Sequence, residues 1–229
     1  MAGRALLLAL VLLACAACGS DDTTAGSGNQ TTAVTTDDRG ETTVTTVDGC
    51  EQVENPATKP DGGQTPPDGP LGDSESPQLV FATNCGDFTV SLDPKLAPNT
   101  GASLVKLARS GFYDDTIFHR IVPGFVIQGG DPTGNGSGGP GYKTVDKPPA
   151  DTRYTKGVVA MAKTADEPAG TSGSQFFVVT GADVGLPPDY AIVGRVTSGI
   201  GVVELIGELG DQSEQPTRTV LIRKVTVQD

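Results

Sequence analysis

The sequence has little positive charge. Lys and Arg together number 16 against 28 Asp and Glu, which gives a formal net charge of −12. Proteins that bind nucleic acid or an anionic membrane surface need a basic patch to do so. We therefore exclude nucleic-acid binding and direct binding to anionic lipid as main functions.

Histidine is almost absent, since His119 is the only one in 229 residues. A zinc site needs several His or Cys ligands close together, so we expect no metal and no other cofactor. Nothing marks a Ser, Cys or Asp as a triad partner of His119, and nucleophilic hydrolysis has little support. A single His among apolar residues is typically structural, and we expect His119 to anchor backbone through hydrogen bonds.

No apolar run near the N-terminus is long enough to span a bilayer, because the stretch from Ala5 to Ala14 covers only ten residues. It follows Arg4 and precedes small residues and cysteines, which predicts a signal peptide over residues 1–17. The small residues before Cys15 and Cys18 resemble the lipobox of bacterial lipoproteins, in which the cysteine is acylated.

We expect lipidation at Cys18, which is followed by "GSDD", a common start for a tether. Cys15 remains the alternative because it has a Leu three positions upstream, and ordinary secretion is a further alternative. The predicted location is outside the cytoplasm, on the outer face of the bacterial cell membrane. The contact with that membrane would be the lipid alone.

Large side chains are scarce from Gly19 to about Ser76, where Thr, Gly, Pro and Asp dominate. Such a segment cannot bury enough apolar surface to offset its chain entropy. Residues 18–76 are therefore predicted to be a disordered tether with a span on the order of 40 Å.

Two further cysteines, Cys50 in the predicted tether and Cys85 in "LVFATNCGDFTVSL", form an even pair in an exported chain. This favours a disulfide, with two free thiols as the alternative. If the two are bridged, the segment from Cys50 to Ser76 would be a strap across the domain and not a free linker.

From Pro77 onward the chain alternates short β-rich runs with turn residues, for example on either side of Asn84-Cys85-Gly86. A helix is predicted in "APNTGASLVKLARSGFY", with Asn99 or Thr100 as N-cap and Gly111 as the stop. "GIGVVELIGEL" predicts a second helix. Many short strands with few helices indicate an antiparallel barrel or sandwich, all-β in class.

Three stretches in this order, "FHRIVPGFVIQGGD", "GTSGSQFFVVT" and "YAIVGRV", resemble the cyclophilin-type peptidyl-prolyl isomerases. The resemblance runs from about Gln78 to Val227 and implies an isomerase domain over residues 77–229. The implied fold is a closed eight-stranded antiparallel barrel capped by two helices. The implied partners are proline-containing polypeptides, and we expect a monomer.

Arg120 lies beside an apolar run, and a lone arginine there is more typical of a buried ion pair. Its neighbours Phe125 and Gln128 offer an apolar wall and a neutral amide, but no nucleophile or proton carrier. Such a site suits rotation about a prolyl bond, in which a donor aimed at the twisted nitrogen stabilises the transition state. We expect Arg120, Phe125 and Gln128 to be catalytic. The resemblance implies that a bend at Pro123-Gly124 brings them together.

The resemblance also implies a substrate groove, whose residues would be Val122, Val126, Ala162, Lys163, Thr164, Gln175, Phe177, Leu186 and Tyr190. Gly185 and Tyr190 stand where many eukaryotic cyclophilins carry a tryptophan that contacts cyclosporin and a second histidine, and Lys163 replaces a common asparagine. A non-catalytic module that binds proline peptides is the competing function. Retention of Arg120 favours the enzyme, because capture alone would need mainly the apolar pocket.

Overall fold

The computed structural model describes residues 46–229. The predicted signal peptide, both candidate lipidation sites and the first part of the predicted tether lie outside the described residues. Among the residues described, no helix has the length and apolar character needed to cross a membrane.

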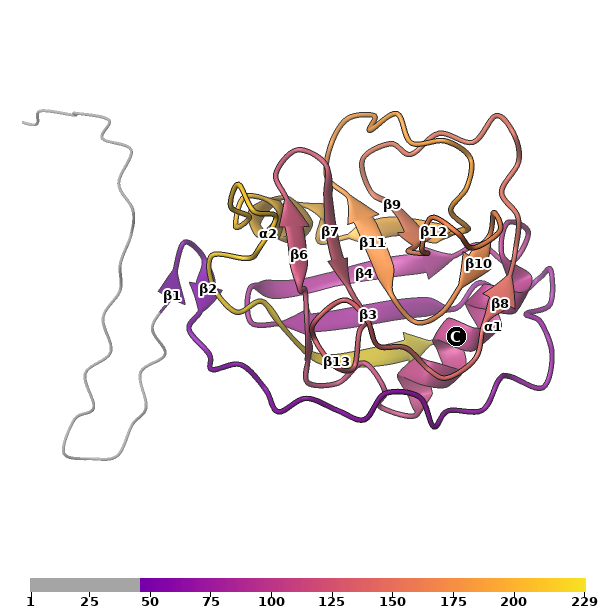
Figure 1. The fold of residues 1–229 in the computed structure, drawn as a ribbon, viewed down its shortest axis with the longest axis horizontal. Helices are drawn as coiled ribbons and strands as arrows, with labels where there is room; N and C mark the ends of the chain where they lie inside the picture. The colour runs from indigo at the N-terminus through magenta and orange to yellow at the C-terminus, as the bar shows by residue number, and fades with distance from the viewer. Residues whose placement is uncertain (1–45) are drawn as a thin grey trace, which may run out of the picture.

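Within residues 46–229, nine strands form one antiparallel sheet in the order β5-β13-β3-β4-β12-β9-β11-β7-β6 (Figure 1). Their bounds are β3 (Gln78–Thr83), β4 (Gly86–Leu92), β5 (Thr116–Ile117), β6 (Arg120–Val122), β7 (Val126–Gly129), β9 (Val158–Met161), β11 (Phe176–Val179), β12 (Ile192–Ser198) and β13 (Leu221–Gln228). Two small antiparallel pairs join β1 (Thr46–Val47) to β2 (Cys50–Glu51) and β8 (Thr144–Val145) to β10 (Thr171–Ser172). The all-β class and the antiparallel pairing are confirmed.

The sheet curls into a half-barrel but does not close, so the prediction of a closed eight-stranded barrel is wrong. Its edge strands β5 and β6 have two and three residues and share no ladder in the described part of the chain. A single bridge from Ile117 to Asp131, just beyond β7, lies near the gap. Strands this short offer too few backbone groups to form a ladder across it.

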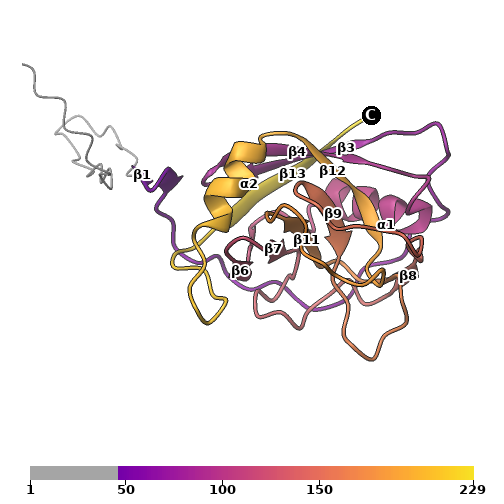
Figure 2. The ribbon, with the colours of Figure 1, turned by 90° about the horizontal axis from the view of Figure 1, so that it is seen from above.

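Helices α1 (Pro98–Arg109) and α2 (Ile200–Gly207) lie toward opposite ends of the sheet (Figures 1 and 2). The start of α1 differs from the expected cap, because the N-cap residue is Ala97 and makes no side-chain cap bond. The carboxylate of Asp146 takes that role, accepting a 2.6 Å hydrogen bond from the Thr100 N–H. A helix's first N–H groups need acceptors, and here the acceptor comes from a distant loop.

The main core fills the concave side of the curled sheet. Alternate side chains of the strands point into it, as period-2 geometry requires, and both helices add apolar residues. Its largest fully buried side chains include Tyr113, Phe88, Phe118, Phe176, Leu79, Leu107, Ile121, Ile127, Met161, Ile206 and Ile222.

Cys50 and Cys85 are joined by a disulfide, the pairing that the even cysteine count favoured. The chain from Cys50 to Ser76, here called the strap, runs along the outside of the domain from β2 to β3 (Figure 1). The prediction of a disordered tether is therefore wrong for residues 50–76. Low hydrophobicity predicted disorder, but polar and backbone hydrogen bonds to the domain hold this segment in place.

Lys59 and Leu71 are among the strap side chains that anchor it. The Lys59 ammonium donates to the carbonyls of Gly111, Phe112 and Asp114, at 2.9, 3.0 and 2.5 Å, so that all three of its N–H groups have acceptors. Leu71 packs against the main core, and its N–H donates to the Pro98 carbonyl at 3.0 Å.

Candidate active site

The hairpin of β6 and β7 brings Arg120 opposite Gln128. Gly124 occupies the turn with a φ of +68°, a conformation that favours glycine, and the Phe125 N–H donates to the Val122 carbonyl at 3.0 Å. The ladder then pairs Arg120 with Gln128 and Val122 with Val126. The expected bend at Pro123-Gly124 is present.

Residues on these strands alternate between two faces. The core face of β6, β7, β9 and β11 consists of Ile121, Ile127, Val159, Met161, Phe176 and Val178, all buried in the main core. The groove face consists of Arg120, Val122, Val126, Gln128, Val158, Ala160, Phe177 and Val179. The ladders run from Arg120 to Gln128, from Gln128 to Phe177 and from Phe177 to Ala160, which places these side chains in one row.

Arg120 has two protein partners on the groove face. Its Nε donates to the Glu214 carboxylate at 2.7 Å, and its Nη1 donates to Gln128 Oε1 at 3.4 Å. The side chain remains 31% exposed. Among the described residues, Nη2 has no hydrogen-bond partner, so this nitrogen remains free to donate to a ligand.

Sequence reasoning missed Glu214, which lies 94 positions from Arg120 in a polar loop. Its backbone has a positive φ of +65°, and its carbonyl accepts from the Ile121 N–H at 3.1 Å. Asp211 holds the loop by accepting from the N–H groups of Ser213 and Gln215. No local pattern in the sequence links this loop to β6.

A second amide extends the polar row. Gln128 Nε2 donates to Gln175 Oε1 at 3.1 Å, and Gln175 Nε2 donates to the carbonyls of Gly136 and Gly138, both at 2.9 Å. Gln175 therefore connects Gln128 to the glycine-rich loop after β7.

A second apolar cluster adjoins this row and contains most of the expected apolar groove residues. Val126 and Phe177 are buried there, and partly buried neighbours complete it: Phe125, Ala162, Val184, Leu186, Tyr190 and Ile192. The rings of Phe177 and Tyr190 meet edge to face, with centroids 5.6 Å apart. This geometry suits a small ring such as proline.

Tyr154 belongs to this cluster and was also missed, because no motif marks it. It is fully buried, packs at 6.3 Å between ring centroids from Phe177, and donates from its hydroxyl to the Tyr190 carbonyl at 2.7 Å. The same hydroxyl accepts from the Tyr190 N–H at 3.0 Å. Burial raises the pKa of Tyr154 to about 12, so the group stays a neutral hydrogen-bonding anchor.

The remaining expected residues form the rim. Lys163 is almost fully buried, with 4% of its side chain exposed, and its Nζ lies 3.7 Å from the Asp189 carboxylate and 5.5 Å from the Tyr190 ring centre. The Thr164 N–H donates to the Glu167 carboxylate at 2.8 Å. Gly185 has a φ of +62° and open space around it, so no side chain forms a wall at that position.

His119 lies immediately before β6 and outside its strand. It is 8% exposed, but neither ring nitrogen has a hydrogen-bond partner among the described residues, so the expected backbone anchor is not present. Burial lowers the pKa of His119, which the nearby charge of Asp131 only partly offsets. The ring is therefore neutral near pH 7.

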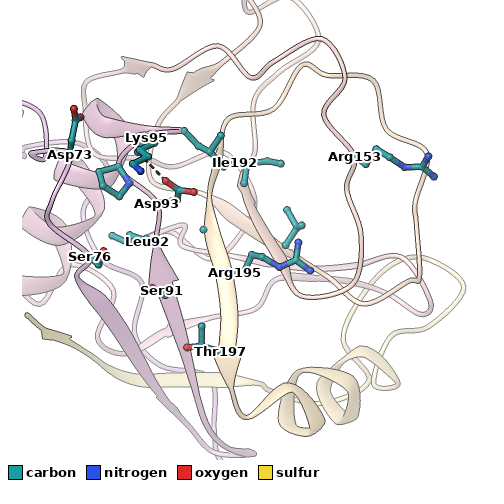
Figure 3. A pocket seen from close by; sticks show the side chains of 14 residues that line it. Asp73, Ser76, Ser91, Leu92, Asp93, Lys95, Arg153, Ile192, Arg195 and Thr197 are labelled. Atoms are coloured by element: carbon teal, nitrogen blue, oxygen red, sulfur yellow. Dashed lines mark hydrogen bonds between the residues drawn. The ribbon is translucent and has the colours of Figure 1, made fainter.

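The groove beside Gln128, Gln175 and Lys163 is a hollow of about 600 Å³. A second hollow of about 550 Å³ lies over β4 and β12, where Asp93, Ile192 and Arg195 line it (Figure 3). It contains none of the expected site residues. Residues 46–229 also contain no cluster of three or more side chains able to hold a metal ion.

Comparison with known proteins agrees with this geometry. The family model described as cyclophilin type peptidyl-prolyl cis-trans isomerase/CLD matches residues 78–227. The chain is 36% identical over 158 residues to peptidyl-prolyl cis-trans isomerase CYP18-2 of Arabidopsis thaliana, covering 67% of this chain and 94% of the relative. It is 39% identical to peptidyl-prolyl cis-trans isomerase A of Mycobacterium tuberculosis, covering 63% and 88%.

A solved structure gives the same result. The cyclophilin-type isomerase of Cryptosporidium parvum, crystallised in the presence of the dipeptide Ala-Pro, superposes with a TM-score of 0.61 at 31% identity. The match covers 66% of this chain and 99% of that one. The chain belongs to the cyclophilin-type peptidyl-prolyl cis-trans isomerase family.

Proposed function

We propose that this domain accelerates rotation about X-Pro bonds in exported polypeptides, with Arg120 as the catalytic donor and Phe125 and Gln128 as its partners in the site. The proposal rests on Nη2 of Arg120, which has no hydrogen-bond partner within residues 46–229, while Glu214 and Gln128 engage the other two nitrogens. A guanidinium held on two sides presents its remaining N–H groups in a fixed direction.

The chemistry needs no covalent step. Twisting a prolyl bond costs about 18 to 20 kcal/mol because amide resonance is lost, and the twisted nitrogen regains a lone pair. An N–H from Arg120 aimed at that lone pair stabilises the twisted state more than the planar one, which is the condition for catalysis. Phe177 and Val126 would hold the proline ring, while the amides of Gln128 and Gln175 orient the guanidinium and the substrate backbone.

The names of the curated relatives support an enzyme over a non-catalytic peptide-binding module. Uncatalysed exchange takes tens to hundreds of seconds, so acceleration is easily measured on a short X-Pro peptide. We expect the full chain to accelerate exchange at micromolar concentration. Peptide binding with no change in the exchange rate would support the binding module instead.

The proposed location is the outer face of a bacterial cell membrane, with lipid attached at Cys18 and the domain acting as a monomer. The short apolar stretch and the cysteines after it support this proposal. Mass spectrometry of the N-terminal peptide of the mature protein tests it. A lipid on Cys15 would move the site, and an unmodified peptide starting elsewhere would refute the anchor.

A further inference from the structure

The strap lies against the loop that supports the active-site glutamines. Residues 132–141, here called the glycine loop, have the sequence "PTGNGSGGPG". Strap N–H groups donate to this loop at three places: Lys59 to the Pro132 carbonyl at 2.9 Å, Gly62 to Gly139 at 2.9 Å and Gln64 to Pro140 at 3.0 Å. In return, the Gly139 N–H donates to Asp61 Oδ1 at 2.8 Å.

The fit between strap and loop is close at the level of the backbone. A Cβ placed on Gly141 would lie 3.1 Å from the Gly62 Cα and 3.2 Å from the Gly63 nitrogen. Gly141 and Gly62 also have positive φ angles of +90° and +74°. Two glycines therefore allow the two backbones to touch where Asp61 and Gly139 bond.

The other side of the glycine loop faces the active site. Its Gly136 and Gly138 carbonyls both accept from Gln175, which in turn accepts from Gln128. Gln128 accepts from Arg120 at 3.4 Å. A continuous series of hydrogen bonds thus runs from the strap, through the glycine loop and two glutamines, to the guanidinium.

The loop needs restraint because five of its ten residues are glycine, the residue that loses most conformational freedom on ordering. One end is fixed from within, since the buried Asp131 carboxylate accepts from the N–H groups of Thr133, Asn135 and Gly136. Burial alone would raise the pKa of Asp131, but the bonds from Thr133 and Gly136 outweigh it and the pKa is lowered. The Asp131 carboxylate also accepts from the Gly138 backbone, and from Gly139 onward the loop is held by the strap.

We propose that Asp61 is a positioning residue of the isomerase site. It acts through Gly139 to hold the carbonyls that fix Gln175, and so sets the geometry of Gln128 and Arg120. This extends the proposed function, on which it rests, to a segment outside the part of the chain that the family model matches, residues 78–227. Asp61 also lines the 600 Å³ hollow beside Gln128 and Gln175.

The test compares three variants of the full chain: Asp61→Ala, Asp61→Asn and, as a matched control, Asp68→Ala at another exposed strap carboxylate. We expect Asp61→Ala to lower kcat/KM by roughly two- to tenfold, the factor that a net hydrogen bond contributes. Asp61→Asn should return to within about twofold of wild type, since an amide oxygen accepts the same N–H. Asp68→Ala should match wild type.

A structural measurement on the same variants does not depend on activity. In Asp61→Ala, the Gly139 N–H should exchange faster with solvent, and the side-chain amide resonances of Gln175 and Gln128 should shift. Both signals should return in Asp61→Asn, with the melting temperatures of all variants close to that of wild type.

Unchanged glutamine resonances in Asp61→Ala would overturn the inference, and so would wild-type kcat/KM in that variant when the wild-type chain is active. A loss that Asp61→Asn does not restore would also overturn it, because the carboxylate charge would then be responsible and not the hydrogen bond. A wild-type chain without isomerase activity would refute the proposed function, while the resonance shifts would still decide whether the strap is coupled to the glutamines.

Discussion

The core face and the groove face of β6, β7, β9 and β11 are built from alternate residues of the same strands, yet their surroundings differ sharply. On the core face, Ile121, Ile127 and Met161 have no exposed surface. On the groove face, Arg120 and Gln128 are part-exposed and bond to each other and to loops. Neighbouring residues of one strand thus serve stability and chemistry separately, and changes to the two faces should have separable effects.

The largest effect should come from Phe176→Ala, which empties a site in the main core. Phe176 is 2% exposed and packs against Phe81, Tyr113 and Phe118. We expect a loss of about 3 to 5 kcal/mol in the free energy of unfolding, measured by urea denaturation. The kcat/KM of the folded fraction should stay near wild type.

Phe177→Ala, one residue further on, provides the contrast. Phe177 lies on the groove face against Tyr154 and Tyr190, so this variant should lose kcat/KM even after correction for the folded fraction. Equal activity losses in both variants would show that the two faces are not separable.

Removing the disulfide should have the next largest effect on the free energy of unfolding, because both cysteines belong to the main core. It closes a loop with a sequence separation of 35, for which the chain-entropy model gives roughly 3 to 4 kcal/mol. A Cys50→Ser, Cys85→Ser double variant should show this loss in the free energy of unfolding. Its kcat/KM should fall far less than that of Arg120 variants, because Lys59 and Leu71 still hold the strap. A melting temperature equal to wild type would contradict a stabilising role.

On the groove face, Arg120→Ala should lower kcat/KM by about 100-fold, the factor typical of removing one donor that stabilises a transition state. Unfolding by urea should change little, since the side chain is part-exposed. Arg120→Lys is the matched variant, and we expect it to recover only part of the activity because an ammonium lacks the fixed fork of donors. Wild-type activity in Arg120→Ala would move the catalytic role elsewhere.

Replacing Glu214 should change kcat/KM less than replacing Arg120, because Glu214 orients Arg120 without facing the substrate. Glu214→Ala should lower kcat/KM by roughly two- to tenfold, in line with one lost hydrogen bond. Glu214→Gln should regain most of this, since its amide oxygen accepts from Nε. If both variants equal wild type, Gln128 alone is enough to hold the guanidinium.

The smallest effect concerns pH. The pKa of His119 is lowered by burial from its ordinary value of 6.5, so the unfolded chain binds a proton there more readily than the folded one. The contribution of neutral His119 to the free energy of unfolding is complete above the pKa that His119 has in the unfolded chain. It is lost as the pH falls from there toward the lower pKa of His119 in the folded protein. In urea unfolding measured across this pH range, His119→Gln should not show this pH-dependent loss in the free energy of unfolding. Activity should stay nearly flat from about pH 6 to 8, because Arg120 does not titrate there.

Side chains on a strand must alternate, so the sequence of β6 by itself puts Ile121 and Arg120 on opposite faces. Which of these faces is the core is decided by the folded sheet. The bend at Pro123-Gly124, which sets the ladder of Arg120 with Gln128, was implied by the resemblance to the family and not by the local pattern. The order of motifs from residues 118 to 196 resembled the family that the comparison confirms.

The tertiary structure alone decided the contacts between distant segments. Glu214 is 94 positions from Arg120, and Asp146 is 46 from the N–H of Thr100 that it caps. The strap has few apolar residues, so its sequence predicts a disordered linker. It is held in part by hydrogen bonds to backbone carbonyls, which no sequence pattern marks. Sequence thus determined that neighbouring residues of a strand lie on opposite faces, since alternation is local. Three features could be seen only in the folded chain: the partners of Arg120, the ordered path of the strap and the open edge of the sheet. Each depends on where residues far apart in the sequence come to lie.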